Sequence, residues 1–499
     1  MQKGVRTGIK MFQQEQEKKE DKNIEKKITP RAENYSQWYL DIIDAAELAE
    51  HSPVKGCMVI KPNGYAIWEK TQEVLNGWFK EKGVRNAYFP MFIPERFLER
   101  EKAHVEGFSP EVAVVTHAGG KKLDEPLIVR PTSETIMYEV FSTWIHSYRD
   151  LPLLINQWAN VVRWEMRPRL FLRTVEFLWQ EGHTVHATHD EADKFAREML
   201  DVYVRFAREY MALPVLAGVK SESEKFAGAL RTYSTEAMMQ DGKALQFATS
   251  HNLGDNFAKS FNVKFLDENN KDVFAWQTSC GLSTRTIGAL VMAHSDDVGL
   301  IIPPKMCYLN FVLIPIFKNE EEKEHVLRKA NEIVDGAKKF GLSVHLDERD
   351  NMRPGEKFFY WEKCGIPMRI ELGPKDIAKG QVILVRRDTS EKTPVGLVDL
   401  NETIKEMLIA IQQNLYDRAE NLLKSRTKTV DLWVDFEKAI EGGNFVLAHF
   451  CGDANVEKEI KDKTGATIRC ISFDTVEEKG KCIYTGKSSN KRVIFAKAY

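Results

Sequence analysis

A run of residues from Phe171 to His183 places aromatic, acidic and imidazole side chains at every second position. If the run is a β-strand, alternation puts four of these side chains on one face: Phe177, Trp179, Glu181 and His183. The preceding run, Asn156 to Glu165, is predicted to be the partner strand, with Arg163 and Glu165 on one face and an arginine-rich turn following. A solvated hairpin with a charged edge is the simpler interpretation of one such strand. Two aromatic rings beside a carboxylate and an imidazole are instead typical of a pocket wall, where a few polar groups orient a ligand.

Two further segments put small polar residues where a predicted strand meets a loop or a helix. The first, Leu127 to Glu134, ends in Thr132-Ser133-Glu134 before a predicted helix. Taken alone, helix capping by Thr132 or Ser133 is a simpler interpretation than ligand binding. The second segment carries three candidate ligand-binding residues: Gln246, Thr249 and His251.

An arginine stands at the predicted start of an apolar helix that runs through Ala293. The segment before it, Gln277 to Thr286, contains Ser283 and Arg285. The helix dipole disfavours a cation at this end of a helix. Arg285 therefore indicates an anionic ligand, which the free backbone amides of the helix start would also favour.

The composition is that of a globular protein with more than one domain. The residues are 43% hydrophobic and 29% charged, as in ordinary globular proteins. A chain of 499 residues is longer than one hydrophobic core usually supports. No apolar run approaches the ~20 residues of a membrane-spanning helix, so we expect a soluble protein that has no membrane partner. The 71 basic and 73 acidic residues give a net charge of -2, so RNA contacts must come from local basic patches. Seven scattered cysteines without a secretory signal favour a cytoplasmic location.

The elements that must position these residues are predicted to form four regions: 1–33, 34–304, 305–408 and 409–499. The first is rich in charge and poor in apolar anchors, which predicts a flexible extension. The second mixes helical patterns with short β-rich runs, which favours an α+β domain on an antiparallel sheet. Pro303-Pro304 ends that pattern, and alternating strands and helices then predict a small α/β domain. A helical stretch from about Thr393 to Lys424 is expected to lead into a small α/β C-terminal domain.

Three segments resemble the motifs of class II aminoacyl-tRNA synthetases: Gly83 to Pro90 (motif 1, the dimer-interface segment), Arg163-Trp164-Glu165 (motif 2) and Gly281 to Arg285 (motif 3). The strings Arg130-Pro-Thr-Ser-Glu134 and Phe177-Leu-Trp-Gln-Glu-Gly-His183 resemble prolyl-tRNA synthetases of the archaeal/eukaryotic-like type, from about Tyr35 to the final residue. This resemblance implies a class II catalytic domain, an anticodon-binding domain and a C-terminal domain of the zinc-binding kind. It also implies ATP-dependent attachment of L-proline to tRNA(Pro) through prolyl-adenylate, with release of pyrophosphate and AMP.

The resemblance assigns roles to residues at matching positions. Arg163 and Arg285 would be catalytic, because they neutralise charge that grows as the proline carboxylate attacks the α-phosphate of ATP. The proline-binding residues would be Thr132, Glu134, Arg163, Phe177, Trp179, Glu181, His183, His251 and Ser283. The ATP-binding residues would be Arg163, Glu165, Gln246, Thr249 and Arg285. Mg²⁺ on the ATP phosphates is implied by the family and not by a visible ligand motif.

Charged loops of the third region resemble a class II anticodon-binding domain. The candidate residues for the anticodon region are Arg349, Arg353, Lys357 and Glu371. Reading unpaired bases takes donors and acceptors on loops, although a solvated charged face is the alternative for each single residue. The implied partners are tRNA(Pro), L-proline and a second copy of the chain in a homodimer.

The C-terminal region departs from the pattern of relatives that hold zinc with two pairs of cysteines. Cys451 and Cys482 match the first members of the pairs, but Val456 and Thr485 stand at the partner positions. Two thiolates do not close a structural zinc site. We therefore expect neither zinc nor another protein-bound metal.

Only about sixty residues separate the second predicted strand from Gln246, too few for the editing domain that many bacterial prolyl enzymes carry between motifs 2 and 3. Alanine is then rejected only by lost packing, by about 10- to 200-fold. Two alternatives stay open. One is a related class II synthetase for threonine, serine or glycine, which the two aromatic residues and the Thr132/Glu134 pair disfavour. The other is a non-catalytic RNA-binding synthetase paralogue, which both motif arginines disfavour.

Overall fold

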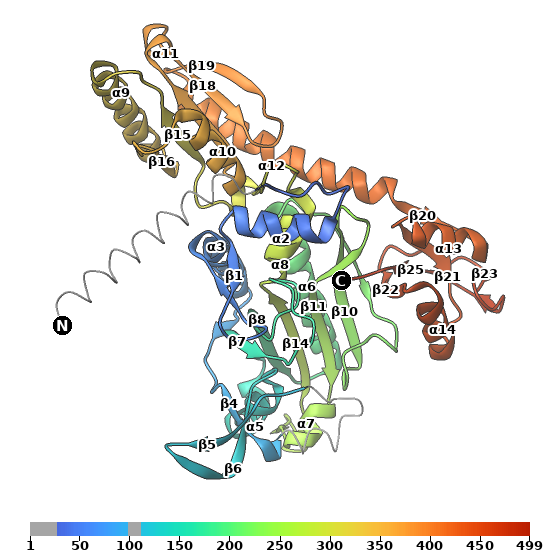
Figure 1. The fold of residues 1–499 in the computed structure, drawn as a ribbon. Helices are drawn as coiled ribbons and strands as arrows, with labels where there is room; N and C mark the ends of the chain where they lie inside the picture. Colours follow the sequence, from blue (N-terminus) through green and yellow to red (C-terminus); the bar gives the residue numbers. More distant parts are fainter. Residues whose placement is uncertain (1–26, 98–110) are drawn as a thin grey trace. The chain divides into compact units, whose positions relative to one another are not determined.

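A computed structural model describes residues 27–97 and 111–499 of the chain (Figure 1). The described residues form two compact units. Unit 1 holds those up to Glu50 with Ile60–Lys70 and Leu290–Asp417, and unit 2 holds His51–Val59, Thr71–Ala289 and Arg418–Tyr499. Most of the predicted extension, residues 1–26, lies outside the described residues, so that expectation stays a prediction.

Unit 2 is built on an eleven-stranded sheet in the order β20-β21-β25-β22-β9-β10-β11-β14-β8-β7-β3. Neighbouring strands run antiparallel except in the pairs β3/β7 and β20/β21. In chain order the strands are β3 (Arg85–Asn86), β7 (Leu153–Val162), β8 (Glu176–His186), β9 (Val215–Val219), β10 (Arg231–Met238), β11 (Ala244–Gly254), β14 (Trp276–Ser283), β20 (Thr427–Thr429), β21 (Phe445–His449), β22 (Thr467–Ser472) and β25 (Arg492–Ala496). The predicted α+β domain on an antiparallel sheet is confirmed.

One face of this sheet is covered by helix α6 (His189–Glu209), which packs on β10, β11 and β14. The helix begins after Thr188, whose side chain accepts the Glu191 N–H. Tyr203 of α6 donates a hydrogen bond to Gln180 Oε1 of β8 at 2.6 Å. Because side chains alternate along a strand, the odd-numbered residues of β8 must point to the opposite face of the sheet.

A smaller layer of unit 2 lies at one end of that opposite face. It contains the sheet β4-β6-β5, formed by Phe92–Pro94, Lys121–Val129 and Val114–Ala118. Helices α5 (Glu134–Trp144) and α7 (Asn256–Phe261) pack together, and the hairpin of β12 (Lys264–Leu266) and β13 (Asp272–Phe274) lies beside them in the chain. Their shared core includes Tyr138, Phe141, Phe257 and Phe261, all buried. This core fixes the start of α5, where two of the predicted site residues lie.

The C-terminal part of unit 2 extends the same sheet. Its helices α13 (Trp433–Glu441) and α14 (Ala454–Thr464) flank β20 to β25, with the short strands β23 (Gly480–Lys481) and β24 (Ser488–Ser489) between. Strand β22 pairs with β9 through Ile471 and Ser472. A Cβ atom at Gly218 of β9 would stand 2.3 Å from the Ile471 carbonyl oxygen, so only glycine permits this approach. The predicted small α/β region is therefore joined to the catalytic sheet by backbone pairing.

Unit 1 contains a five-stranded sheet in the order β16-β15-β17-β18-β19, with β15, β16 and β17 parallel and the rest antiparallel. The strands are β15 (Phe311–Pro315), β16 (Val344–Leu346), β17 (Met368–Leu372), β18 (Gln381–Arg386) and β19 (Lys392–Gly396). Helices α9 (Glu320–Lys339), α10 (Pro354–Cys364) and α11 (Pro374–Ala378) alternate with them, and α12 (Leu400–Ser425) follows. The predicted α/β domain is confirmed.

The helical stretch expected from about Thr393 is wrong at its start, because Lys392–Gly396 forms the edge strand β19. Pro394 is tolerated there since an edge strand needs fewer ladder N–H groups. The helix begins only at Leu400 and runs across the predicted limit between residues 408 and 409. The four predicted region limits themselves stay predictions.

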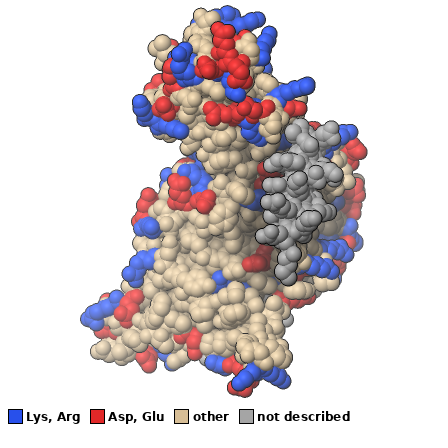
Figure 2. Space-filling view, turned by 60° about the vertical axis from the view of Figure 1, so that its left-hand side comes forward, with Lys and Arg blue, Asp and Glu red and all other residues tan. Residues whose placement is uncertain are grey.

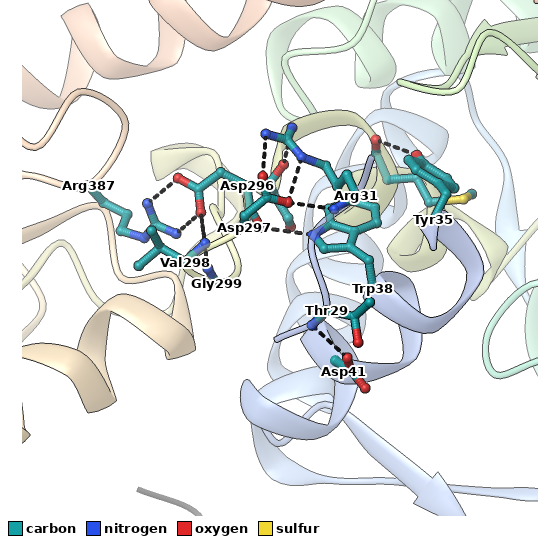
Figure 3. Close-up of polar contacts among 12 residues, drawn as sticks. Thr29, Arg31, Tyr35, Trp38, Asp41, Asp296, Asp297, Val298, Gly299 and Arg387 are labelled. Atoms are coloured by element: carbon teal, nitrogen blue, oxygen red, sulfur yellow. Dashed lines mark hydrogen bonds and ion pairs between the residues drawn. The ribbon is translucent and has the colours of Figure 1, made fainter. Parts of the chain in front are cut away.

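Unit 1 also holds the segment that follows helix α8 (Arg285–His294) (Figure 3). Both carboxylate oxygens of Asp296 accept hydrogen bonds from Arg387 at 2.7 and 2.8 Å, and the Asp296 carbonyl accepts from Trp38 at 2.9 Å. Asp297 pairs with Arg31 at 3.0 Å (Figure 3). Trp38 belongs to α2 (Tyr35–Ala45), the helix that precedes β1 (Ala49–His51), β2 (Met58–Ile60) and α3 (Pro62–Glu81). The segment is thereby held from the α/β domain and from the N-terminal helix of the same unit.

Candidate active site

A cavity of about 280 Å³ lies in unit 2, on the face of the sheet opposite α6. Twelve of the thirteen residues predicted to bind proline or ATP line it: Thr132, Glu134, Arg163, Phe177, Trp179, Glu181, His183, Gln246, Thr249, His251, Ser283 and Arg285. The first and last of these residues, Thr132 and Arg285, lie more than 150 positions apart in the chain, so the fold brings them together. Their individual roles stay predictions.

Strand register explains how the cavity walls form. Glu181 of β8 lies opposite Gly281 of β14, and His183 lies opposite Ser279. On the other side of β14, Thr249 and His251 of β11 lie opposite the same two β14 residues, Gly281 and Ser279. The alternation predicted for β8 is confirmed, since its odd-numbered residues from 177 to 183 all line the cavity.

The segment Thr132–Glu134 enters the cavity instead of capping α5. Ser133 is the N-cap residue but makes no side-chain cap hydrogen bond, and its hydroxyl donates to Glu181 Oε1 at 2.5 Å. Thr132 Oγ1 donates to Glu134, the first residue of α5, and both are buried. Capping by Thr132 or Ser133 is therefore wrong as an account of this segment. Thr132 and Glu134 line the cavity, and Ser133 bonds Glu181, which lines it as well.

Glu181 and His183 form a buried ion pair at the base of the cavity. Glu181 accepts from Gln157 Nε2 at 2.8 Å in addition to Ser133, and lies 3.1 Å from His183 Nε2. Burial opposes ionisation of Glu181, but these hydrogen bonds outweigh it and hold the pKa of its carboxyl below the usual range. Burial likewise opposes protonation of His183, but Glu181 and Glu134 raise its pKa. Tyr138 contacts the second ring nitrogen at 3.1 Å, which fixes the imidazole orientation.

The Arg163 guanidinium is open to the cavity and lies between aromatic and acidic groups. Its Nε donates to the Pro131 carbonyl at 2.8 Å, and its carbon lies 5.1 Å from the centre of the Trp179 ring. The surrounding protein lowers its pKa, and Glu134 and Glu181 partly oppose that shift. The Pro131 carbonyl and the Trp179 ring face thus hold the Arg163 guanidinium in one orientation.

Arg285 is the first residue of α8, as predicted. Its Nε donates to the Leu172 carbonyl at 3.2 Å, and its backbone N–H donates to Ser283 Oγ at 3.3 Å. Burial, together with repulsion from Arg163 and Arg173, lowers the pKa of Arg285 to about 10. Cations that repel one another beside a helix start are suited to a polyanionic ligand.

Glu165 is the predicted residue that does not line the cavity. Strand β7 ends at Val162, so the alternation assumed for this side chain does not extend to it. Glu165 accepts the N–H of Arg167 at 2.9 Å and lies 3.7 Å from Arg173. Its role in ATP binding stays a prediction.

Nine residues line the cavity beyond the predicted ones, among them Glu224, Phe226, Thr232 and Ser279, which sequence reasoning missed. Thr232 Oγ1 lies 3.0 Å from His251 Nδ1, and the Phe226 ring lies 4.8 Å from the His251 ring. Burial and the nearby His183 lower the pKa of His251 to about 3, so its imidazole is neutral. Alternation along β10 could have indicated Thr232, but nothing in the sequence pattern marks the loop that carries Phe226.

The predicted anticodon residues lie in unit 1 around the start of α10. Arg349 pairs with Asp347 at 2.6 Å and lies over the Tyr360 ring at 4.4 Å, and Arg353 is exposed at the N-terminus of the helix. Lys357 is buried and donates to the Asp347 carbonyl at 2.9 Å. Burial raises the pKa of Asp347, but hydrogen bonds from Arg349 and Trp361 and the charges of Arg349 and Lys357 lower it more, to about 2.

Glu371, the fourth anticodon candidate, is 8% exposed and lies on β17. It accepts from Arg369 at 2.9 Å and from Lys392 at 3.1 Å. Internal ion pairs therefore engage Glu371, Lys357 and Arg349, although the Arg349 side chain stays 35% exposed, and Arg353 is exposed. The anticodon role of all four stays a prediction.

Cys451 and Cys482 lie near one hydroxyl group in the C-terminal part. Thr485 Oγ1 donates to Cys451 Sγ at 3.9 Å. Burial opposes ionisation of Cys482, but hydrogen bonds from Thr485 and neighbouring backbone lower its pKa. Across residues 27–97 and 111–499, no group of three or more His, Cys, Asp or Glu side chains is placed to hold a metal ion. The expected absence of zinc stays a prediction.

Three family models match the chain. The tRNA synthetase class II core domain (G, H, P, S and T) matches residues 116–294, an anticodon binding domain matches 310–407, and the prolyl-tRNA synthetase C-terminal model matches 433–499. Fold and cavity thus define a class II aminoacyl-tRNA synthetase.

Curated relatives narrow this class. The chain is 54% identical over 488 residues to a proline–tRNA ligase of Porphyromonas gingivalis, and 56% identical over 481 residues to one of Chlorobium chlorochromatii. It is 53% identical over 492 residues to a proline–tRNA ligase of Bacteroides fragilis. Each alignment covers 95% of this chain and 99% of the relative. The chain belongs to the prolyl-tRNA synthetase family.

In the part of the chain that the structure describes, no helix combines the length and apolar character needed to span a membrane.

Proposed function

We propose that the chain activates L-proline with ATP to give prolyl-adenylate and pyrophosphate, and then transfers the prolyl group to tRNA(Pro) with release of AMP. The observation that carries this proposal is the composition of the single cavity wall that joins β8, β11, β14 and the start of α5. It combines carboxylates, two aromatic rings and two arginines in one cavity.

The acidic and aromatic half of the cavity fits proline. A secondary ammonium ion offers two donors and a positive charge, and Glu134 with the Thr132 hydroxyl supplies a carboxylate and an oxygen acceptor. Phe177 and Trp179 stand edge to face at 6.1 Å between ring centres and both line the cavity, so they offer apolar contact surface to a pyrrolidine ring. His251, held neutral by burial, adds no charge that would repel the ammonium ion.

The basic half fits the phosphates of ATP. Arg163 and Arg285 are desolvated and repel each other, so an anion between them relieves that repulsion. Such preorganised cations stabilise charge that develops as the proline carboxylate attacks the α-phosphate. Gln246 and Thr249 line the cavity beside them and are suited to the ribose, and Glu165 is proposed for the nucleotide from the outside. Mg²⁺ would come with ATP, since this ion commonly keeps its waters and binds substrate phosphates instead of a closed protein cage.

The α/β domain of unit 1 is proposed to bind the anticodon stem of tRNA(Pro). Arg353 and Arg349 are its accessible cations near the start of α10. Replacement of Arg353 by alanine is expected to raise KM for tRNA in aminoacylation more than KM for proline. An equal change in both KM values would contradict the proposed contact between Arg353 and tRNA.

A homodimer is proposed from exposed apolar side chains of unit 2. Tyr88 is 71% exposed, Trp164 53% and Met166 77%. Figure 2 shows a broad stretch with few charged side chains on one face of the molecule. Exposed apolar patches of this kind commonly mark protein interfaces. Sedimentation velocity is expected to give a particle of two chains, and a monomer at micromolar concentration would contradict the proposal.

The archaeal/eukaryotic-like type and a cytoplasmic location are also proposed. The segment between β8 and β11 supports the first proposal, because it consists of α6, β9, β10 and their connections, and β9 and β10 belong to the eleven-stranded sheet. None of the seven cysteines, all within the described residues, forms a disulfide, which supports the proposal of a reducing compartment.

The deciding experiment is ATP–pyrophosphate exchange with each of the twenty amino acids, followed by aminoacylation of tRNA. Exchange dependent on proline is expected. Exchange with threonine, serine or glycine alone would favour another class II synthetase, and RNA binding without any exchange would favour a non-catalytic paralogue.

A further inference from the structure

The loop between β9 and β10, residues 221–230, forms part of the cavity wall. Glu224 and Phe226 of this loop line the cavity. The Phe226 N–H donates to Thr232 Oγ1 at 2.9 Å, and the same hydroxyl lies 3.0 Å from His251 Nδ1. The position of the loop therefore determines part of the cavity wall. It also determines which groups contact His251, the neutral histidine of the cavity.

The near half of the loop, residues 221–225, carries no apolar side chain, whereas Phe226, Ala227 and Ala229 of the far half pack on the core shared by α5 and α7. Within residues 221–230, all of which the structure describes, only Ser221 and Ala229 are buried. Its far end is tied to β11 by the Leu230 N–H, which donates to the Asn252 carbonyl at 2.8 Å. The near half of the loop therefore depends on polar contacts for a fixed position.

Helix α14 of the C-terminal part supplies those contacts. Ser221 Oγ donates to Glu457 Oε1 at 2.8 Å, and both side chains are buried. Burial raises the pKa of Glu457, while hydrogen bonds from Ser221 and Ser223 oppose the shift. One turn further along the helix, Lys461 Nζ lies 3.6 Å from Glu224 Oε1.

The C-terminal part is also fixed to the strand that leads into the loop. Strand β22 pairs with the last residues of β9, and Gly218 allows the backbones to approach. The loop thus leaves a strand edge held by β22 and passes directly under α14. Both contacts come from residues more than 200 positions away in the chain.

We infer that Glu457 and Lys461 of α14 are positioning residues, which hold the loop 221–230 over the proline half of the cavity. This inference rests on the proposed function, because it assigns the C-terminal part a role in proline binding. The Glu457 carboxylate fixes the near end of the loop through Ser221 and Ser223. Lys461 then holds the Glu224 side chain through their ion pair. With the loop fixed in this way, the Phe226 ring keeps its contact with the His251 ring.

The test compares Glu457→Ala with Glu457→Gln in ATP–pyrophosphate exchange by the full chain. Alanine removes the acceptor, and KM for proline is expected to rise roughly tenfold while KM for ATP changes less than about twofold. Glutamine keeps an acceptor oxygen, so it should restore most of the proline affinity. Lys458→Ala is the matched control, because Lys458 lies on the same helix and pairs only with Asp462 at 2.7 Å among the contacts the structure shows for it.

A second measurement reports the loop directly. Trypsin cleaves after Lys225, so release of that loop should speed cleavage there in Glu457→Ala but not in the glutamine or Lys458 variant. Ser221→Ala is a milder variant for the same contact, and combined with Glu457→Ala it should add nothing further.

Equal KM values and equal cleavage rates for Glu457→Ala and the Lys458 control would overturn the inference. A joint rise of both KM values with a lower melting temperature would do the same, because that pattern indicates general damage. If the unmodified chain shows no proline-dependent exchange, the proposed function fails instead. Cleavage at Lys225 then still decides whether α14 anchors the loop.

Discussion

Replacement of Glu181 by glutamine removes the negative charge at the centre of the buried network under the cavity. Glu181 accepts from Ser133 at 2.5 Å and Gln157 at 2.8 Å on one oxygen and faces His183 at 3.1 Å with the other. A glutamine can keep one oxygen toward Ser133 and Gln157, but its amide nitrogen then faces the protonated imidazole. The bond to His183 is lost, and two donors confront each other.

The magnitude follows from the type of bond that is lost. A buried hydrogen bond to a charged group contributes about 1.5–3 kcal/mol. We therefore expect the free energy of unfolding to fall by about that amount, and kcat/KM for proline to fall by about tenfold or more. KM for ATP should change little, because the arginines of the basic half do not contact this network directly.

The loss should depend on pH in a defined way. Ordinary pKa values are 4.5 for glutamate and 6.5 for histidine, and the fold lowers the first and raises the second. The Glu181 contribution is present above pH 4.5 and the His183 contribution below pH 6.5, so both are complete between these values. As pH rises through the raised pKa of His183, the histidine contribution is lost and the difference between wild type and variant should shrink.

Urea unfolding at about pH 5.5 and about pH 9 measures this difference. Glu176→Gln is the matched control, since Glu176 lies on the same strand, accepts from Asn160 at 2.7 Å and does not line the cavity. A Glu181→Gln variant within about 0.5 kcal/mol of wild type at both pH values would refute the ion pair. A loss that is identical at both pH values would show that His183 keeps one protonation state between them and would refute the predicted pH dependence.

Three further predictions concern other parts of unit 2. Glu236 is buried between Lys220 at 2.7 Å and Arg469 at 2.9 Å, so Glu236→Ala strands two buried cations and should lower the free energy of unfolding by about 3–5 kcal/mol in urea. A loss below about 1 kcal/mol would show that water reaches these groups. Alanine should be activated about 10- to 200-fold less efficiently than proline in exchange, and alanyl-tRNA(Pro) should persist in the presence of the protein; rapid deacylation would contradict the missing editing site. Elemental analysis of purified protein should find no bound zinc at Cys451 and Cys482, and one tightly held equivalent would prove that expectation wrong.

The local pattern of the sequence predicted a large part of the site. Strand alternation alone placed Phe177, Trp179, Glu181 and His183 on one face, because the period of a strand is independent of what packs on it. Arg285 was found by its conflict with the dipole of the helix that it begins. The sequence pattern failed for Glu165, since nothing local shows that β7 ends at Val162.

The tertiary structure decided what lies beside those residues. Ser133 bonds Glu181, which lies on strand β8 almost fifty positions later in the chain. The local sequence around Ser133 does not show this partner, so helix capping was the wrong prediction. Phe226 and Glu224 stand on a loop without periodicity, and only its contacts with His251 and α14 bring them to the cavity. The sequence by itself determined the class of chemistry, because residue types and spacing are local properties. The cavity itself, and the contacts that the C-terminal part makes with its loop, depend on pairing between strands far apart in the chain. Local sequence patterns do not show which strands pair.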